Sequence, residues 1–220
     1  MFHAYRKSQL RTDVNRIGLH ILSLSGDAFR VWQSADSGTN DAPLLVGGVW
    51  APLLFMPSHV ATGEWWRVLT GPFVHVGFYH LALDAGAFLM LYHSLREPSR
   101  LWRLVIFAAC AAGSTGLAAM FMEANGTLCG LSGAGHGLMA VSALEMMTMD
   151  DRDNVRIGAV CLTGLVAKSL IEAITGQVWF ASLHLGEIGA PVAICHLGGV
   201  LGGLIIFGIR QLRCKELARL

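Results

Sequence analysis

Residues 129–137, Cys-Gly-Leu-Ser-Gly-Ala-Gly-His-Gly, place a serine, Ser132, among glycines where an apolar segment begins. Residues 195–199, Cys-His-Leu-Gly-Gly, place a lone histidine, His196, in a second apolar segment near the C-terminus. A serine hydroxyl becomes an effective nucleophile when a base takes its proton, and a neutral imidazole can do this at neutral pH. The two stretches therefore predict a nucleophile and a base, provided that the fold brings them together.

The composition is that of a membrane protein. The 220 residues are 54% hydrophobic and 14% charged, whereas soluble domains carry about 25% charged residues. The net charge of +1 gives no reason to expect a nucleic-acid partner. The five cysteines show no spacing typical of a metal site or a disulfide framework. We expect no metal and no cofactor, and a lipid bilayer as the surroundings.

The apolar segments predict an all-α bundle of six transmembrane helices within residues 42–209. The expected spans are 43–60, 78–94, 101–122, 128–147, 155–175 and 189–209. Fourteen of the sixteen lysines and arginines fall in the N-terminal region, the even-numbered turns or the C-terminal tail. Since positive charge collects on the cytoplasmic side, both termini are predicted to be cytoplasmic.

Two segments flank this bundle. Residues 1–41 are expected to form a cytoplasmic N-terminal segment, in which 17–33 has the spacing of an amphipathic helix lying in the membrane interface. Residues 210–220 are expected to form a basic cytoplasmic tail.

Helix geometry predicts that three polar side chains share one depth. With a rise of about 1.5 Å per residue, Ser132 lies roughly 22 Å, His80 roughly 21 Å and His196 roughly 20 Å above the cytoplasmic ends of their spans. This depth is within reach of water from outside in a core about 30 Å thick. The Ser132 backbone N–H, near a helix start, and the His80 ring are candidate donors to an oxyanion.

Glycines are expected to serve both the turn and the helix packing. Gly130 and Gly133 allow a tight turn before and after the serine. Gly133 with Gly137, and Gly199 with Gly203, form small-residue faces on the fourth and sixth spans. Close packing of these faces is expected to bring the serine and the histidine within hydrogen-bond reach.

At these residues the sequence resembles the rhomboid intramembrane serine proteases, over roughly residues 60–205. The residues that carry the resemblance are Trp66-Arg67 in the first loop, His75, His80 and Asp84 in the second span, Gly130-Leu131-Ser132-Gly133, and His196 with Gly199 and Gly203. The resemblance implies cleavage of membrane-anchored client proteins near the outer face through a Ser132–His196 dyad. His80, residue 84 and the Ser132 N–H would hold the oxyanion, supported by Gly130, Gly133, Gly199, Trp66, Arg67 and His136.

His136 and the first loop are similar to the rhombosortase branch of this family. His136 stands where rhomboids commonly carry a tyrosine packed against the catalytic histidine, and residues 64–67 read Glu-Trp-Trp-Arg. This branch implies a bacterial inner-membrane enzyme that processes C-terminal Gly-Gly-type sorting segments, with release to water or transfer to an amine. Pairing of Ser132 with His136 instead of His196 is an alternative, because residues four apart share a helix face.

Several side chains leave alternatives open. Asp84 replaces the family's asparagine: ionised it would repel an oxyanion, whereas burial could keep it protonated and able to donate. An alternative function is therefore a catalytically impaired rhomboid-like protein that binds clients without cleaving them, and a transporter ranks third. His75 either lines a water-filled mouth or caps a loop. Lys168 and Glu172, spaced i, i+4, are expected to pair with each other.

Overall fold

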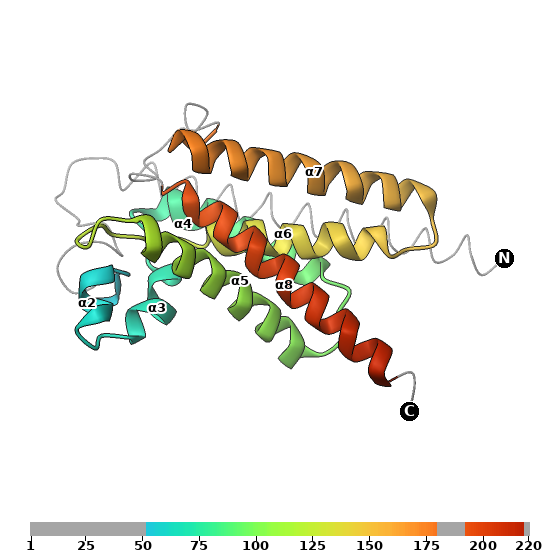
Figure 1. Cartoon of the computed structure of the whole chain (residues 1–220), viewed down its shortest axis with the longest axis horizontal. Helices are drawn as coiled ribbons and strands as arrows, with labels where there is room; N and C mark the ends of the chain where they lie inside the picture. Colours follow the sequence, from blue (N-terminus) through green and yellow to red (C-terminus); the bar gives the residue numbers. More distant parts are fainter. Residues whose placement is uncertain (1–51, 180–191, 218–220) are drawn as a thin grey trace. The chain divides into compact units, whose positions relative to one another are not determined.

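A computed structural model describes residues 52–179 and 192–217, which are helical apart from turns, loops and one isolated β-bridge (Figure 1). The elements in chain order are α2 (Pro57–Ala61), α3 (Trp66–Thr70), the 3-10 helix η2 (Gly71–Phe73), α4 (Phe78–Ser94), α5 (Arg100–Phe121), α6 (Ser132–Met147), α7 (Arg152–Thr175) and α8 (Ile194–Leu217).

Local sequence explains where the long helices start and stop. The Ser99 hydroxyl accepts the Trp102 N–H at 3.4 Å and caps α5. The Asp151 carboxylate caps α7 in the same way. Gly176 ends α7 in the left-handed region at φ 69°, where glycine has no β-carbon to oppose it. These boundaries agree with the third and fifth expected spans to within a few residues.

Three of the described helices, α5, α7 and α8, are long and apolar enough to cross a membrane. A fourth span results if Trp66–Phe73 and Phe78–Ser94, which meet at a bend of 99°, are counted together. Helix α6 has 16 residues and is shorter than the roughly 20 needed for a full span. The count of six spans therefore stays a prediction.

The expected first span is not a continuous helix in the part that the structure describes. Residues 43–51 lie outside the described residues, as do 1–42 with the expected amphipathic segment. Phe55 is bridged to Leu128, and α2 then begins at Pro57 and has five residues. The reason is local, because Pro52 and Pro57 lack a backbone N–H and bias the preceding residues away from helix.

The last helix also differs from the expected sixth span. Residues 189–191 lie outside the described residues, and α8 begins at Ile194. It continues to Leu217, so residues 210–217 of the expected tail extend the helix. Arg210, in this extension, contacts the buried carboxylates of Glu145 and Glu97.

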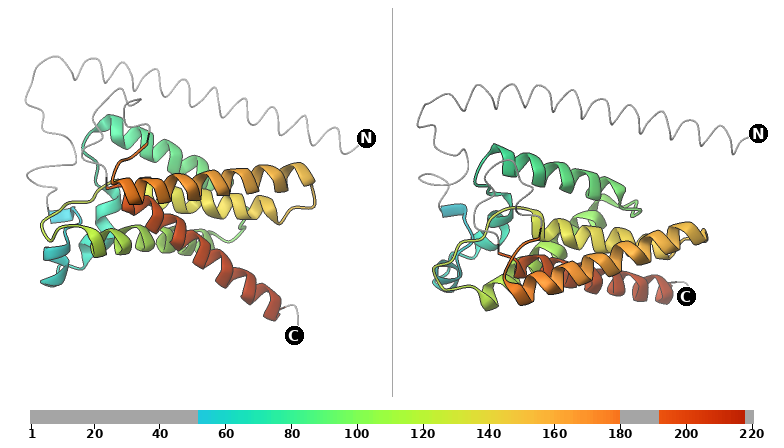
Figure 2. Two further views of the ribbon diagram at one scale, coloured as in Figure 1. Left: turned by 45° about the horizontal axis from the view of Figure 1, so that its top comes forward. Right: turned by 90° about the horizontal axis from the view of Figure 1, so that it is seen from above.

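Helix α6 is the centre of the bundle and contacts α4, α5, α7 and α8 (Figure 2). Half of its residues are buried: Gly133, Ala134, Gly137, Leu138, Ala140, Val141, Ala143 and Glu145. A helix that is apolar on all sides is typical of a buried position. Ser132, at its first position, is partly buried where α6 meets these helices and lines a cavity.

Glycines allow α8 to approach α6 and α5 at backbone distance. A β-carbon on Gly199 would overlap the Gly133 carbonyl, and one on Gly137 would lie 2.5 Å from the Gly199 carbonyl oxygen. On the other side of α8, one on Gly113 would lie 2.5 Å from the Gly198 oxygen. The faces predicted from glycine spacing are the faces that meet, as close packing in a bilayer requires.

Basic residues meet at one end of the bundle, opposite the start of α6. The buried carboxylate of Glu145, near the end of α6, accepts from Arg210 Nη1 at 2.7 Å and from the Arg96 backbone N–H at 2.7 Å. Arg210 also lies 3.5 Å from Glu97. The ends expected to be cytoplasmic are thus together in space, which agrees with the charge pattern along the chain.

We expect Gly199→Ala to destabilise the protein by about 1–3 kcal/mol, because its methyl group would meet the Gly133 backbone, which cannot rotate away. The measurement is the thermal unfolding midpoint in detergent. Gly208→Ala on the same helix is the matched control, since nothing lies within 4 Å of its β-carbon position. Equal midpoints for the two variants would contradict the backbone contact.

Candidate active site

The turn before α6 fixes the position of Ser132. Gly130 adopts φ 95°, in the left-handed region, and a β-carbon there would lie 2.7 Å from Asp84 Oδ2 and 2.9 Å from His80 Nε2. The Leu131 N–H donates to Asp84 Oδ2 at 2.6 Å. Glycine is therefore needed at position 130 both for conformation and for space.

Ser132 and His196 lie against each other across the α6–α8 contact. The Ser132 Oγ is 3.3 Å from His196 Nε2. Each side chain is on the first turn of its helix, one residue before Gly133 and three before Gly199. The distance is that of a long hydrogen bond, which is common between a nucleophile and a base without substrate.

His136 stacks on the His196 ring, with centroids 4.0 Å apart and an interplanar angle of 9°. Its Nδ1 lies 2.7 Å from the Ser132 carbonyl oxygen, which can only accept, so Nδ1 carries the hydrogen. Its Nε2 is 3.0 Å from Lys168 Nζ, which can only donate. Both ring nitrogens are thus engaged away from the Ser132 hydroxyl, which disfavours a Ser132–His136 pair.

Behind His196 lies a buried glutamate. Glu172 on α7 is 0% exposed, and its Oε2 is 2.7 Å from His196 Nδ1. Its other oxygen accepts from Lys168 Nζ at 2.7 Å and from the Trp179 backbone N–H at 2.8 Å. The expected Lys168–Glu172 pair is present, and it occupies only one of the two carboxylate oxygens.

The histidines and the glutamate have ligand atoms close enough to surround a metal ion. Suitable atoms of His136, Glu172 and His196 lie within 4.8 Å of one another. The Lys168 ammonium, however, contacts both His136 Nε2 and Glu172 Oε1. In this arrangement the cation that these groups share is the ammonium of Lys168.

A second polar cluster holds the other side of the Gly130 turn. Asp84 Oδ2 lies 3.3 Å from His75 Nε2 and 3.4 Å from His80 Nε2, besides accepting from Leu131. The His75 Nδ1 is 3.1 Å from the Phe73 carbonyl, so His75 is buried between a loop and Asp84. Asp84 Oδ2 therefore links α4 to the turn at Gly130 and Leu131, which precedes Ser132.

The first loop supports the site from a distance. Arg67 is buried, donates to the Leu54 carbonyl at 2.8 Å and pairs with Glu64. The carbonyl of the neighbouring Phe55 accepts a hydrogen bond from the backbone N–H of Leu128, on the segment that leads to Ser132. Hydrogen bonds from His59 and Arg67 lower the pKa of Glu64 below its ordinary value. Trp66 Nε1 donates to the Pro52 carbonyl at 3.2 Å.

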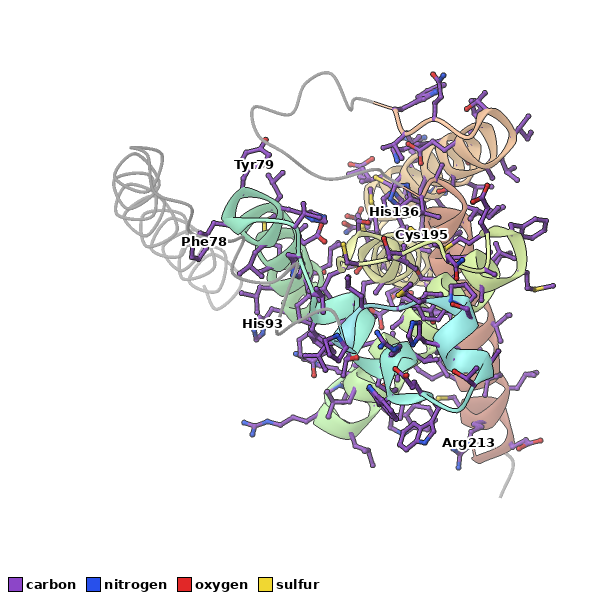
Figure 3. All side chains as sticks on the ribbon, turned by 90° about the vertical axis from the view of Figure 1, so that its left-hand side faces the viewer. Phe78, Tyr79, His93, His136, Cys195 and Arg213 are labelled. Atoms are coloured by element: carbon purple, nitrogen blue, oxygen red, sulfur yellow. The ribbon has the colours of Figure 1, made fainter. Side chains whose placement is uncertain are left out.

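A cavity of about 780 Å³ opens onto these groups. Its lining includes Ser132, His136, His196, Lys168, His80 and Asp84, together with apolar residues of α4 such as Leu83, Ala87 and Leu91. Figure 3 shows His136 and Cys195 in the interior, whereas Phe78, Tyr79 and Arg213 project outward. The volume suits a short apolar stretch of polypeptide, with a backbone carbonyl near Ser132.

The contact of Glu172 with His196 is the feature of this cluster that the sequence did not predict. The i, i+4 spacing of Lys168 and Glu172 predicts only their pairing with each other. The available signal was the position of Glu172 inside an apolar segment, where an ionisable side chain is by default a functional candidate.

Comparison with known proteins identifies the family of this chain. A family model described as a rhomboid domain matches residues 62–211. Rhomboid protease GluP of Bacillus subtilis is 30% identical over 148 residues, which are 66% of this chain and 26% of that protein. Rhomboid-like protein 11, chloroplastic, of Arabidopsis thaliana is 26% identical over 148 residues, 64% of this chain and 51% of that protein.

The chain thus spans about half or less of the length of these two relatives. No solved structure matched it. The match to the rhomboid domain covers more than half of the chain and includes the residues of both polar clusters. Together with its long apolar helices, it shows that this chain is a multi-pass membrane protein of the rhomboid family.

Proposed function

We propose that this protein is an intramembrane serine endopeptidase in which Ser132 is the nucleophile and His196 the general base. The observation that carries the proposal is the 3.3 Å distance between Ser132 Oγ and His196 Nε2 at the wall of the cavity. The substrates would be membrane-anchored client proteins, because the cavity wall beside the two groups is largely apolar.

The reaction follows from the positions of these atoms. His196 Nε2 takes the Ser132 Oγ proton as the oxygen attacks a peptide carbonyl carbon. The tetrahedral intermediate collapses when the peptide C–N bond breaks, and the leaving nitrogen takes the proton from Nε2. Water then attacks the acyl-enzyme with His196 again as base, which releases a carboxylate and restores Ser132.

The oxyanion would be held by the Ser132 backbone N–H and the His80 ring. Ser132 is the first residue of α6, where backbone N–H groups have no partner within the helix. His80 lines the cavity on the other side of the Gly130 turn. We assign Asp84 to orienting both groups, through its contacts with His80 and Leu131.

The site would lie toward the outer face of a bacterial inner membrane. Ser132 begins α6 and the Glu145–Arg210 cluster is near its other end, thirteen positions or about 20 Å away along the helix. We place the basic end and both termini on the cytoplasmic side, because positive charge collects there. Ser132 would then lie far from the cytoplasm.

The rhombosortase reading is supported by His136 and residues 64–67. In this proposal the client segment is a C-terminal Gly-Gly-type anchor. The acyl-enzyme would then react either with water or with an amine that takes the acyl group. The second candidate, a client-binding protein with impaired catalysis, is favoured by one observation, the carboxylate of Asp84 on the cavity wall.

We expect Ser132→Ala to abolish labelling of the purified protein by a fluorophosphonate probe, because the probe needs the serine oxygen. His196→Ala is expected to slow labelling by roughly 10³-fold or more, since the hydroxyl loses its base. Ser142→Ala on the same helix is the matched control and should label as the native protein does. Native protein that never labels at Ser132 would contradict the protease proposal.

Variants of Asp84 separate the two candidate functions. Asp84→Asn keeps an oxygen for the Leu131 N–H and removes a charge beside the oxyanion, so we expect labelling at the native rate or faster. Asp84→Ala leaves that buried N–H unpaired, which lowers the stability by about 1–3 kcal/mol, and it frees the turn that leads into Ser132, so we expect slower labelling. Labelling by Asp84→Asn but not by the native protein would favour the impaired alternative.

A pair of reporters tests the client class. Both reporters would carry the same soluble domain and the same C-terminal apolar span. They would differ at two positions only, which are Gly-Gly in one reporter and Leu-Leu in the other. We expect cleavage to fall at least about tenfold when both glycines are replaced by leucine, because bulkier residues hinder approach of the backbone to Ser132. Equal cleavage rates would reject the rhombosortase assignment and leave the serine mechanism intact.

A further inference from the structure

We propose that Glu172 is a positioning residue for this reaction and makes the dyad a Ser132–His196–Glu172 triad. The carboxylate would hold His196 in the tautomer that leaves Nε2 free for the serine, and would stabilise the imidazolium that forms when Nε2 takes the proton. The inference rests on the proposed function of Ser132 and His196, and adds a residue from a third helix, α7.

The hydrogen-bond partners of Glu172 define one arrangement of protons. Its Oε1 receives two groups that can only donate, the Lys168 ammonium and the Trp179 backbone N–H, at 2.7 and 2.8 Å. Its Oε2 faces His196 Nδ1 at 2.7 Å. A carboxylate can only accept, so Nδ1 carries the hydrogen and Nε2 presents its lone pair to Ser132 Oγ.

Charge balance explains how this carboxylate can remain ionised within a bundle of apolar helices. An unpaired buried carboxylate would be costly, and Lys168 supplies the opposite charge at one oxygen. The second oxygen is left for the imidazole. In the transition state the imidazolium adds one positive charge directly beside this oxygen, so the attraction strengthens at the moment when the base becomes charged.

Glu172 acts through His196 and has no place for contact with a substrate. It is 0% exposed, and the described lining of the cavity includes His196, His136 and Lys168 but not Glu172. His136 covers one face of the His196 imidazole by stacking on it. The His196 ring is thus fixed on its face by His136 and at its Nδ1 edge by Glu172.

The substitution Glu172→Gln gives a sharp test, because the surroundings dictate how the amide must lie. Two donors at the Oε1 position require the amide oxygen there, so the NH2 group is turned toward His196 Nδ1. That nitrogen must then accept, which moves the ring hydrogen to Nε2, where it blocks removal of the Ser132 proton. We expect kcat to fall at least about 10²-fold with KM within about threefold.

Glu172→Asp distinguishes this role from simple filling of space. It keeps the carboxylate but shortens the side chain, whereas glutamine keeps the shape but loses the charge. If Glu172 positions His196, aspartate retains more Ser132 labelling than glutamine does. If Glu172 only fills space, the order reverses, and that result would overturn the proposal.

Glu145→Gln is the matched control for removing a buried, paired carboxylate. Glu145 is 2% exposed and pairs with Arg210 at 2.7 Å, near the other end of α6 from Ser132. We expect it to lower the thermal midpoint while labelling of Ser132 stays within about threefold of native. Equal loss of labelling in Glu145→Gln and Glu172→Gln would assign both effects to stability and reject the triad.

A measurement on the native chain covers the case in which Glu172→Gln does not fold. With ¹⁵N-labelled histidine, the His196 ring should show a strongly downfield Nδ1-bound proton, assigned by its loss in His196→Ala. Absence of that proton would reject the triad. Native protein that fails to label at Ser132 rejects the proposed function, whereas normal labelling of Glu172→Gln rejects only the role of Glu172.

Discussion

The contact between the α6 and α8 backbones is the constraint on which the rest of the structure depends. Between apolar helices in a bilayer there is no hydrophobic driving force, so close packing and interhelical hydrogen bonds must hold them together. Gly133 and Gly199 remove the side chains at the crossing, and the backbone of each helix fills the space left by the other. Ser132 and His196 stand at the same end of this crossing, and their separation of 3.3 Å is a consequence of how closely the glycines allow the helices to approach.

Because His196 is buried beside the partly buried Ser132, its ring needs polar neighbours. Each ring nitrogen and carboxylate oxygen needs a partner in a medium that supplies little water. The structure meets this requirement with a chain of contacts from Ser132 through His196 and Glu172 to Lys168, which returns to His136. His136 closes the circuit by donating to the carbonyl of Ser132. The charged residues inside the fifth span are therefore explained by the site, in addition to pairing with each other.

The sequence was sufficient for features that depend on local spacing and insufficient for those that depend on helix rotation. Glycine spacing located the α6–α8 crossing, and apolar length located α5 and α7 closely. Pro52 and Pro57 were visible as irregularities, yet the bridge of Phe55 to Leu128 that replaces a helix there depends on a partner 73 positions away. The Lys168–Glu172 pair was predicted correctly, whereas the contact of Glu172 with His196 could not be predicted, for a related reason. The distance of Glu172 from Lys168 can be read along one helix, whereas its distance from His196 depends on which face α7 turns toward α8.

The two buried carboxylates on either side of Ser132 hold different parts of the proposed dyad. Asp84 accepts the Leu131 N–H and so fixes the backbone that leads into Ser132. Glu172 faces Nδ1 of His196 and so fixes the ring that faces the serine hydroxyl. Each carboxylate comes from a different helix, α4 or α7, and neither of these helices carries Ser132 or His196. The glycine crossing sets the distance between serine and histidine, but a distance alone leaves the rotation of the turn and of the ring free. The outer helices α4 and α7 supply those two constraints, which is why the polar residues of this site are spread over four helices, α4, α6, α7 and α8.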